Sequence, residues 1–258
     1  MLIKTLVKIP LLKKLITSLG IRLLKLLKKN RGYFRIKDIN MFLDFLDPID
    51  REIILYQEYE NSELNFLIKK IKENKINYFY DVGSNCGYYS IIIAKEIADI
   101  DVISFEPNKE AYFKFIKTLK DNPTLSKRIH AENFGLSNTS SQLEMQSMIK
   151  HGYSQTGGTA IIDNHKYKNF DTFFGDFKIG SDYIKITNQT IAIKIDVEGH
   201  ELNVLEGLKK VLQHNKAIIQ IEIFAKNFET TNKYLISLGF EVMFNVNQRS
   251  NYFYTNIK

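Results

Sequence analysis

The residues best suited to chemistry in this sequence form a cluster of acids and one histidine at residues 194–201. The stretch reads Lys-Ile-Asp-Val-Glu-Gly-His-Glu and follows an apolar run. We therefore expect Asp196 at the carboxyl end of a buried strand, with Glu198 and His200 around the start of the next helix. Ionisable groups gathered at the end of a sheet suit general acid–base chemistry. Asp196, Glu198 and His200 are the predicted catalytic residues, and Asp196 or His200 is expected to accept the proton.

Other roles for these residues stay open on the sequence alone. Asp196 can hold a positively charged part of a ligand, or join Glu222 in binding a hard cation, so a metal is neither predicted nor excluded. Glu198 and Glu201 can simply favour a helix N-terminus through the helix dipole. His200 can equally be an ordinary surface histidine.

A second candidate site is the loop within residues 80–90, which read YDVGSNCGYYS. The flanking apolar residues predict a strand, a glycine loop and a helix, the order that places a ligand at the carboxyl end of a parallel strand. Gly83 and Gly87 tolerate positive φ and the close approach of a ligand. The first turn of the helix offers free N–H groups to a negatively charged ligand group. The pattern D-x-G-x-N-x-G matches neither the dinucleotide fingerprint nor a P-loop.

An acid follows this loop at a spacing that suits a nucleoside. Glu106 lies 25 residues after Asp81, near the end of the next predicted strand. In α/β nucleotide sites an acid about 20 residues beyond the glycine loop accepts hydrogen bonds from ribose hydroxyls. We therefore expect the loop and Glu106 to bind one ligand together.

Strand-like and helix-like runs alternate along most of the chain, which predicts an α/β fold with a doubly wound parallel sheet. With 258 residues and 44% hydrophobic content, the chain suits one domain at residues 51–258 and an appendage at residues 1–50, which is expected to be a basic amphipathic helical segment. Residues 138–165 are expected to form loops or an edge hairpin over a site and to shape an acceptor pocket. A short helix is predicted at residues 171–177, and an antiparallel hairpin is expected at the end of the chain.

The appendage is strongly basic. Residues 1–37 hold eleven Lys and Arg and no acid, so the rest of the chain carries a net charge of −4, and nucleic acid is not an expected partner. Leucines at helical spacing over residues 2–29 predict a basic amphipathic helix without an apolar run long enough to span a bilayer. This helix is expected either to bind an anionic membrane surface or to pack on the domain. The single cysteine, Cys86, fits a reducing compartment such as the cytoplasm.

Three segments together resemble the FkbM family of S-adenosylmethionine-dependent methyltransferases. They are residues 79–90, Phe105-Glu106-Pro107 and, as the most specific part, residues 193–201. The resemblance implies a class I methyltransferase fold, with a seven-stranded, mostly parallel sheet and an antiparallel last strand. It also implies S-adenosyl-L-methionine as the cofactor. Ser84 and Cys86 replace residues common in the family's loop, but both are small enough to keep the turn.

The resemblance assigns roles by position in the chain. Asp196 and the turn at residues 198–201 would lie near the transferred methyl group. The implied cofactor-binding residues are Asp81, Gly83, Asn85 and Gly87 at the methionine end, Glu106 at the ribose, and Asn133 and Gly135 near the adenine.

The sequence therefore predicts an O-methyltransferase. Its expected acceptor is a small molecule or glycan, with a sugar hydroxyl of a surface glycan or glycolipid precursor as the favoured case. We expect it in the cytoplasm, with peripheral binding to the inner membrane face through residues 2–29. One alternative is an NAD(P)-dependent oxidoreductase on a similar sheet, which the loop spacing disfavours. Another is a non-catalytic peripheral membrane protein that keeps the fold.

Overall fold

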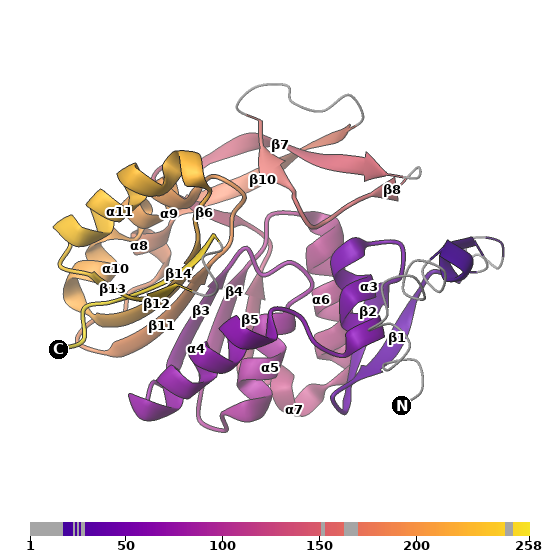
Figure 1. The fold of residues 1–258 in the computed structure, drawn as a ribbon, viewed down its shortest axis with the longest axis horizontal. Coiled ribbons are helices and arrows are strands. Elements are labelled where there is room, and N and C mark those ends of the chain that lie inside the picture. The colour runs from indigo at the N-terminus through magenta and orange to yellow at the C-terminus, as the bar shows by residue number, and fades with distance from the viewer. Residues whose placement is uncertain are drawn as a thin grey trace.

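A computed structural model describes residues 18–22, 24, 26, 29–150, 153–162, 170–245 and 250–258. Its centre is a seven-stranded sheet (Figure 1), in which β14 is antiparallel to both of its neighbours and the other adjacent pairs are parallel. In order across the sheet, its strands are β13 (Glu241–Asn245), β14 (Asn251–Thr255), β12 (Lys216–Glu222), β11 (Thr190–Ile195), β3 (Tyr78–Val82), β4 (Asp101–Phe105) and β5 (Ile129–Glu132). The predicted fold class, including the antiparallel strand near the end, is confirmed.

Helices cover both faces of this sheet, which is why its central strands are continuous apolar runs. One hydrophobic cluster joins one face to α4, α5 and α6, and a second joins the other face to α9, α10 and α11. The helices are α3 (Pro48–Tyr56), α4 (Asn61–Glu73), α5 (Tyr88–Glu96), α6 (Lys109–Asp121), α7 (Pro123–Ser126), α8 (Gly180–Tyr183), α9 (Glu201–Gly207), α10 (Lys209–His214) and α11 (Phe228–Ser237), with a 3₁₀ turn, η1, at Ala225–Asn227.

A second sheet lies over the end of the central sheet from which the glycine loop emerges (Figure 1). Its strands are β6 (Gly135–Ser137), β7 (Ser141–Lys150), β8 (Tyr153–Ser154), β9 (Ala160–Ile161) and β10 (Phe170–Ile179). We call this sheet the flap, and residues 155–159 between β8 and β9 the strap. Residues 138–165 were predicted to form loops or an edge hairpin, and strands β7 and β8 within this range form such a hairpin.

The helix predicted at residues 171–177 is wrong, because these residues belong to strand β10. β10 pairs antiparallel with β7 from Phe170 opposite Met148 to Phe177 opposite Ser141. Burial alternates near its end, where Gly175 and Phe177 are buried and Asp176 is exposed. This period of two, together with the four phenylalanines of β10, is typical of a half-buried strand.

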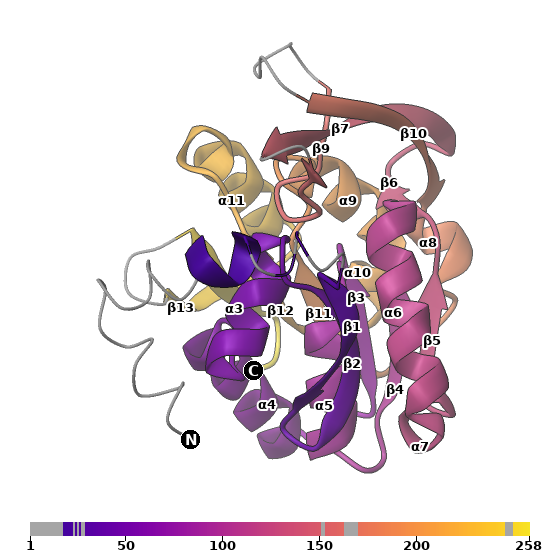
Figure 2. The same ribbon diagram turned by 90° about the vertical axis from the view of Figure 1, so that its right-hand side faces the viewer.

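The appendage was predicted to be helical, but part of it forms strands. Residues 31–44 form an antiparallel hairpin of β1 (Arg31–Ile36) and β2 (Ile39–Asp44), which lies beside α6 (Figure 2). The backbone N–H of Phe42 donates to Thr118 on α6. The inward side chains of β2 (Ile39, Met41 and Leu43) join the same hydrophobic cluster as α5. The helical prediction for residues 1–50 is therefore wrong for this hairpin, which is packed into the domain.

Most of the predicted amphipathic helix lies outside the described residues. Residues 18–22, 24 and 26 are helical. Ile21 and Leu24 pack against Phe45 and Leu55, whereas Leu19, on the predicted apolar face, is exposed. Within the described part of the chain, no helix combines the length and the apolar character needed to cross a membrane.

Candidate active site

The glycine loop brings the ends of β3 and β11 into contact. Gly83 has a φ of 83°, and a Cβ there would lie 1.9 Å from the backbone oxygen of Asp196. Gly87 has a φ of 78°, and a Cβ there would lie 2.2 Å from the ring of Phe115. Both positions therefore need glycine for conformation and for space. The close approach at Gly83 places the predicted catalytic cluster beside the predicted cofactor loop.

Asp81 offers a buried acceptor that the fold leaves unused. Its side chain is fully buried, and its Oδ2 accepts a hydrogen bond of 2.6 Å from the Ser90 hydroxyl. Its Oδ1 has no hydrogen-bond partner among the described residues. Burial raises the pKa of this carboxyl. A buried acceptor without a donor is costly, so this oxygen suits a ligand that brings a donor such as an ammonium group.

Glu106 is held in place by two backbone N–H groups. Its Oε2 accepts from Asn85 at 2.7 Å and its Oε1 from Asn108 at 2.8 Å. Burial raises the pKa of Glu106 to about 7. Each carboxylate oxygen can accept a further hydrogen bond, so the fixed side chain retains the capacity to bind two ligand hydroxyls. This arrangement fits the predicted ribose-binding role.

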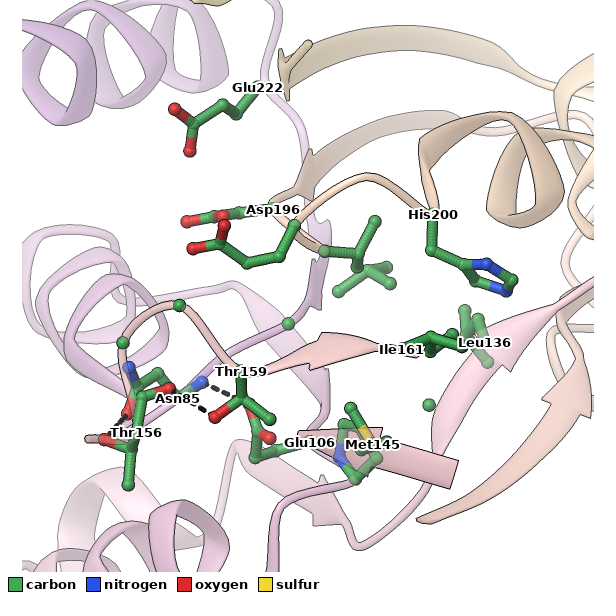
Figure 3. Close-up of a pocket in the computed structure, with 18 of the residues that line it drawn as sticks. Asn85, Glu106, Leu136, Met145, Thr156, Thr159, Ile161, Asp196, His200 and Glu222 are labelled. Carbon is green, nitrogen blue, oxygen red and sulfur yellow. Dashed lines mark hydrogen bonds between the residues drawn. The ribbon is translucent and has the colours of Figure 1, made fainter. Parts of the chain in front are cut away.

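A cavity of about 90 Å³ connects the residues at the end of the sheet. Figure 3 shows Asp196 and Glu222 along one side, with Asn85, Thr156 and Glu106 along the other. Among the predicted site residues, the cavity is lined by Gly83, Asn85, Glu106, Gly135, Asp196, Glu198 and His200.

Three predicted residues have other surroundings. Asp81 lines a smaller adjoining cavity of about 30 Å³, which also contacts Gly83 and Asp196. Gly87 serves the turn and packs against α6. The Asn133 amide donates to the backbone oxygens of Glu106 and Pro107, at 2.8 and 3.5 Å, so it braces the end of β4. The predicted contact of Asn133 with adenine stays a prediction.

Glu198 has the environment of a proton acceptor. Burial is the main cause that raises its pKa to about 7, and the Asp196 and Glu222 carboxylates add to the shift. Glu198 adopts a φ of 51°, a left-handed conformation uncommon for a residue with a side chain. The backbone N–H of Gly158 in the strap acts against this rise and lowers the pKa of Glu198. A carboxyl that titrates near neutral pH at a cavity wall suits general base chemistry.

The other two catalytic candidates are more strongly engaged within the protein. Asp196 forms an ion pair of 2.9 Å with the buried Lys194 ammonium, and burial, as the larger cause, and the charge of Asp196 raise the pKa of the nearby Glu222 carboxyl. His200 lies 2.9 Å from the Ser137 hydroxyl through Nε2, and burial lowers its pKa to about 4. A histidine with that pKa is neutral at pH 7 and a weak base. The geometry therefore favours Glu198, and the assignment of the base stays a prediction.

The strap is fixed over the cavity by a buried charged cluster. The Thr156 hydroxyl lies 2.6 Å from Asp47 Oδ2 and 3.0 Å from Asn85 Oδ1, and the Thr156 N–H also donates to Asp47. The Lys114 ammonium pairs with Asp50 at 2.7 Å and lies 3.6 Å from Asp47. We call Asp47, Asp50 and Lys114 the anchor cluster. It ties the strap to α3 and to α6, and the contact between Thr156 and Asn85 ties the strap to the cofactor loop.

The sequence reasoning missed Thr156, Thr159 and the anchor cluster. Thr159 accepts from the Asn108 amide at 3.2 Å and lies 2.7 Å from the Ser147 hydroxyl. The available signal was Gly157-Gly158 within a polar stretch, which indicated a loop but not its contacts. No group of acids, histidines or cysteines among the described residues has the arrangement of a metal site.

The order of the central sheet, the glycine loop after β3 and the acid after β4 define a class I S-adenosylmethionine-dependent methyltransferase. The unpaired Asp81 oxygen, and the Glu106 carboxylate with its capacity for two ligand hydroxyls, fit that cofactor. The Methyltransferase FkbM domain matches residues 81–242, and the chain belongs to this family. The resemblance, the enzyme class and the cofactor predicted from the sequence are thereby confirmed.

Among curated proteins, the chain is similar to hexuronic acid methyltransferase AglP of Haloferax volcanii. The two are 28% identical over 167 residues, which make up 64% of this chain and 63% of AglP. One similar solved structure is methyltransferase FkbM from Methylobacillus flagellatus KT, at 16% identity and a TM-score of 0.46, covering 70% of this chain and 43% of that one. Another is precorrin-6y C5,15-methyltransferase from Geobacter metallireducens GS-15, at 9% identity and a TM-score of 0.46, covering 77% and 88%.

Proposed function

We propose that this protein is an O-methyltransferase that transfers a methyl group from S-adenosyl-L-methionine to a sugar hydroxyl of a glycan or glycolipid precursor. One observation carries the proposal: Glu198, with a pKa of about 7, lines both the cofactor cavity and a wider neighbouring cleft. The similarity to AglP, which is named for a sugar acid, supports a sugar as the acceptor. Membership of a methyltransferase family removes the support for an oxidoreductase.

The bound cofactor supplies an electrophilic methyl group. Asp81 would accept a hydrogen bond from the cofactor's ammonium group, and Glu106 would accept hydrogen bonds from its ribose hydroxyls. Glu198 takes the proton from the acceptor hydroxyl, while the strap and the flap hold that hydroxyl in line with the methyl carbon. Asp196 and Glu222 would contribute negative charge that favours the positively charged cofactor, and the neutral His200 lines the same cavity.

The test is methyl transfer to a panel of simple glycosides by the purified protein. Glu198→Gln should lower kcat by about 10²–10⁴-fold, the usual contribution of general base catalysis, while the Kd for S-adenosylmethionine changes little. In the wild type, kcat should rise with pH through about 7, because the base must be deprotonated, and this limb should be absent in Glu198→Gln. Glu229→Gln, at an exposed position on α11, is the matched control.

The rival assignments predict a different ranking of variants. If Asp196→Asn or His200→Ala abolishes transfer while Glu198→Gln retains near-wild-type turnover, Glu198 is not the base. Glu60 and Glu106 also have pKa values of about 7. The Kd of the cofactor must therefore be measured across the same pH range, to separate cofactor binding from the chemical step.

We also propose that the protein works at the inner membrane face, held there by residues 2–29. The exposed Leu19 and Leu26 side chains in that segment support contact with lipid. Deletion of residues 1–30 should release the protein from anionic liposomes and spare cofactor binding. If the truncated protein stays bound to liposomes, this helix is not the membrane anchor.

A further inference from the structure

A wide cleft lies between the flap and the start of α9, next to the cofactor cavity. Its volume is about 730 Å³. The cleft and the cofactor cavity share five lining residues: Gly157, Gly158, Ile161, Glu198 and His200. A molecule in the cleft therefore meets the cofactor cavity at Glu198. If the cleft holds the acceptor, its reacting hydroxyl lies at this shared edge.

The cleft presents a buried hydrogen-bonding atom that the protein does not use. Gln146 on β7 lines the cleft and is only 5% exposed, yet its Oε1 has no partner among the described residues. A buried amide oxygen without a donor costs free energy, which a ligand hydroxyl can recover. Gln155 and Asn203 add two further amide side chains to the same lining. This lining suits a ligand that carries several hydroxyl groups.

An aromatic ring lies beside these amides. Phe224 lines the cleft, and its ring is 4.0 Å from the point that a Cβ on Gly199 would occupy. Gly199 has no side chain, so the turn between Glu198 and His200 places no Cβ against that side of the ring. Amides for hydroxyl groups and a ring for the apolar face of a pyranose together match a sugar.

One end of the cleft carries a positive charge. Lys226, in η1, is exposed and is the one Lys or Arg among the described residues that line the cleft. No ion pair involves Lys226 in the described part of the chain. It lines the cleft but not the cofactor cavity, whereas Glu198 lines both. The available cation therefore lies away from the point of transfer.

We propose that the acceptor is a sugar that carries a carboxylate, and that Lys226 binds this carboxylate while Glu198 faces the reacting hydroxyl. The inference rests on the proposed function and specifies the substrate class for the same site. The hydroxyl oxygen forms a bond to the methyl carbon, the carbon–sulfur bond breaks with its electron pair on sulfur, and the hydroxyl proton passes to Glu198. The product is a methyl ether of the sugar acid, with its carboxylate free. A carboxylate at Glu198 itself would meet like charge once Glu198 is ionised.

The test compares methyl glycosides of glucuronic and galacturonic acid with the corresponding neutral glycosides. Wild-type protein should methylate a uronoside with a lower KM than its neutral counterpart. Lys226→Gln should raise the KM for the uronoside about five- to tenfold, as expected for one ion pair near the surface, and leave the neutral sugar unaffected. The Kd for S-adenosylhomocysteine should not change. Lys233→Gln, which removes an exposed charge from the neighbouring helix α11, should match the wild type.

A second variant tests the sugar-binding part separately. Gln146→Leu should raise the KM for acidic and neutral sugars alike, with little change in the thermal midpoint, because only the ligand uses the Oε1 atom. Equal KM values for both sugar types in the wild type, or an unchanged preference in Lys226→Gln, would overturn the role of Lys226. A base-labile methyl ester as the product would do the same.

Failure of this inference can be told apart from failure of the proposed function. If neutral glycosides are methylated and uronosides are not, the acidic acceptor is wrong and the sugar methyltransferase stands. If neither type is methylated although the cofactor binds, the acidic sugar is also excluded, and the sugar acceptor falls with it. If S-adenosylmethionine does not bind, the cofactor site itself has been misassigned.

Discussion

The two sides of the active site are built in different ways. On the sheet side, Gly83, Asp81 and Glu106 are held by the backbone of the central sheet and by bonds between residues near one another in the fold's core. On the flap side, the strap is held by single side chains from distant parts of the chain, such as Asp47, which lies 109 residues before Thr156. On the sheet side, the backbone conformation and the close packing tolerate few substitutions. The flap side depends on a small number of polar contacts that another sequence can replace.

This difference suits the division of labour within the site. The cofactor is the same for every member of a methyltransferase family, and its half of the site is formed by main-chain geometry. The acceptor differs among enzymes, and its half is formed by a flap whose contacts with the sheet are side-chain bonds. Loops and edge elements carried by a rigid scaffold are where specificity usually changes.

Removal of the Lys114 charge should have the largest effect and should fall on the flap side. Lys114→Met leaves the Asp47 and Asp50 carboxyls buried without their cation, which should lower the free energy of unfolding by about 3–5 kcal/mol. The loss should be smaller at pH 5 than at pH 8, because protonated carboxyls cost less to bury. Urea denaturation at both pH values measures it, with the exposed Lys120→Met on the same helix as the control.

A small effect of Lys114→Met, similar to that of Lys120→Met, would contradict the proposed anchor. The strap would then be held by its other contacts, including the contact between Thr156 and Asn85. The flap side would then not depend on a few polar contacts, and the proposed difference between the flap side and the sheet side would lose its main support.

Substitution of Gly83 probes the sheet side. Gly83→Ala should destabilise the fold by about 2–5 kcal/mol, because positive-φ strain adds to overlap with the backbone of Asp196. Gly239→Ala is the matched control, since Gly239 has a φ of 84° but no atom within 4 Å of the added Cβ. The difference between the two variants in denaturation isolates the cost of overlap. If they lose equal stability, the close approach of β3 and β11 is not what requires glycine at position 83.

The sequence predicted the sheet side because its determinants are local. Residues 80–90 carry strand, glycine and helix signals in one run, and Glu106 follows at the spacing of one βα unit. The flap was only partly predictable. Residues 171–177 looked helical although they pair as β10 with β7, a contact over a long separation in the chain. The β1–β2 hairpin was not predicted. Its alternating buried residues Ile39, Met41 and Leu43 pack against α5 and α6, which lie much later in the chain, so the local sequence does not show this contact.

The position of the catalytic cluster could be predicted from the sequence, but the residue that acts as the base could not. The run from Lys194 to Glu201 marked the end of β11 correctly. Which of its acids titrates near pH 7 depends on contacts that the local sequence does not show. These are the Lys194 ion pair at Asp196 and the strap at Glu198. Burial against Phe177 of β10 and Ser137 of β6 likewise sets the state of His200.

His200 lies where the two sides meet, and its titration should give the smallest measurable effect. Burial lowers its pKa from 6.5 to about 4. As the pH falls from about 6.5 towards 4, the unfolded chain gains a proton that the folded chain does not, so the free energy of unfolding should fall across this window. Glu198 acts in the opposite sense, because its raised pKa makes the fold less stable as the pH rises from 4.5 to about 7. The net pH dependence of the wild type therefore does not isolate either group.

The contribution of His200 can be isolated from the difference in unfolding free energy between a His200 variant and the wild type. His200→Gln should lose less stability than the wild type between pH 6.5 and 4, whereas His214→Gln, at an exposed position, should follow the wild type. Thermal unfolding at several pH values measures both variants. If His200→Gln keeps the wild-type slope, the pKa of His200 is the same in the folded and the unfolded chain. In that case the flap covers the start of α9 less closely than the contact between Ser137 and His200 indicates, and water reaches the His200 ring.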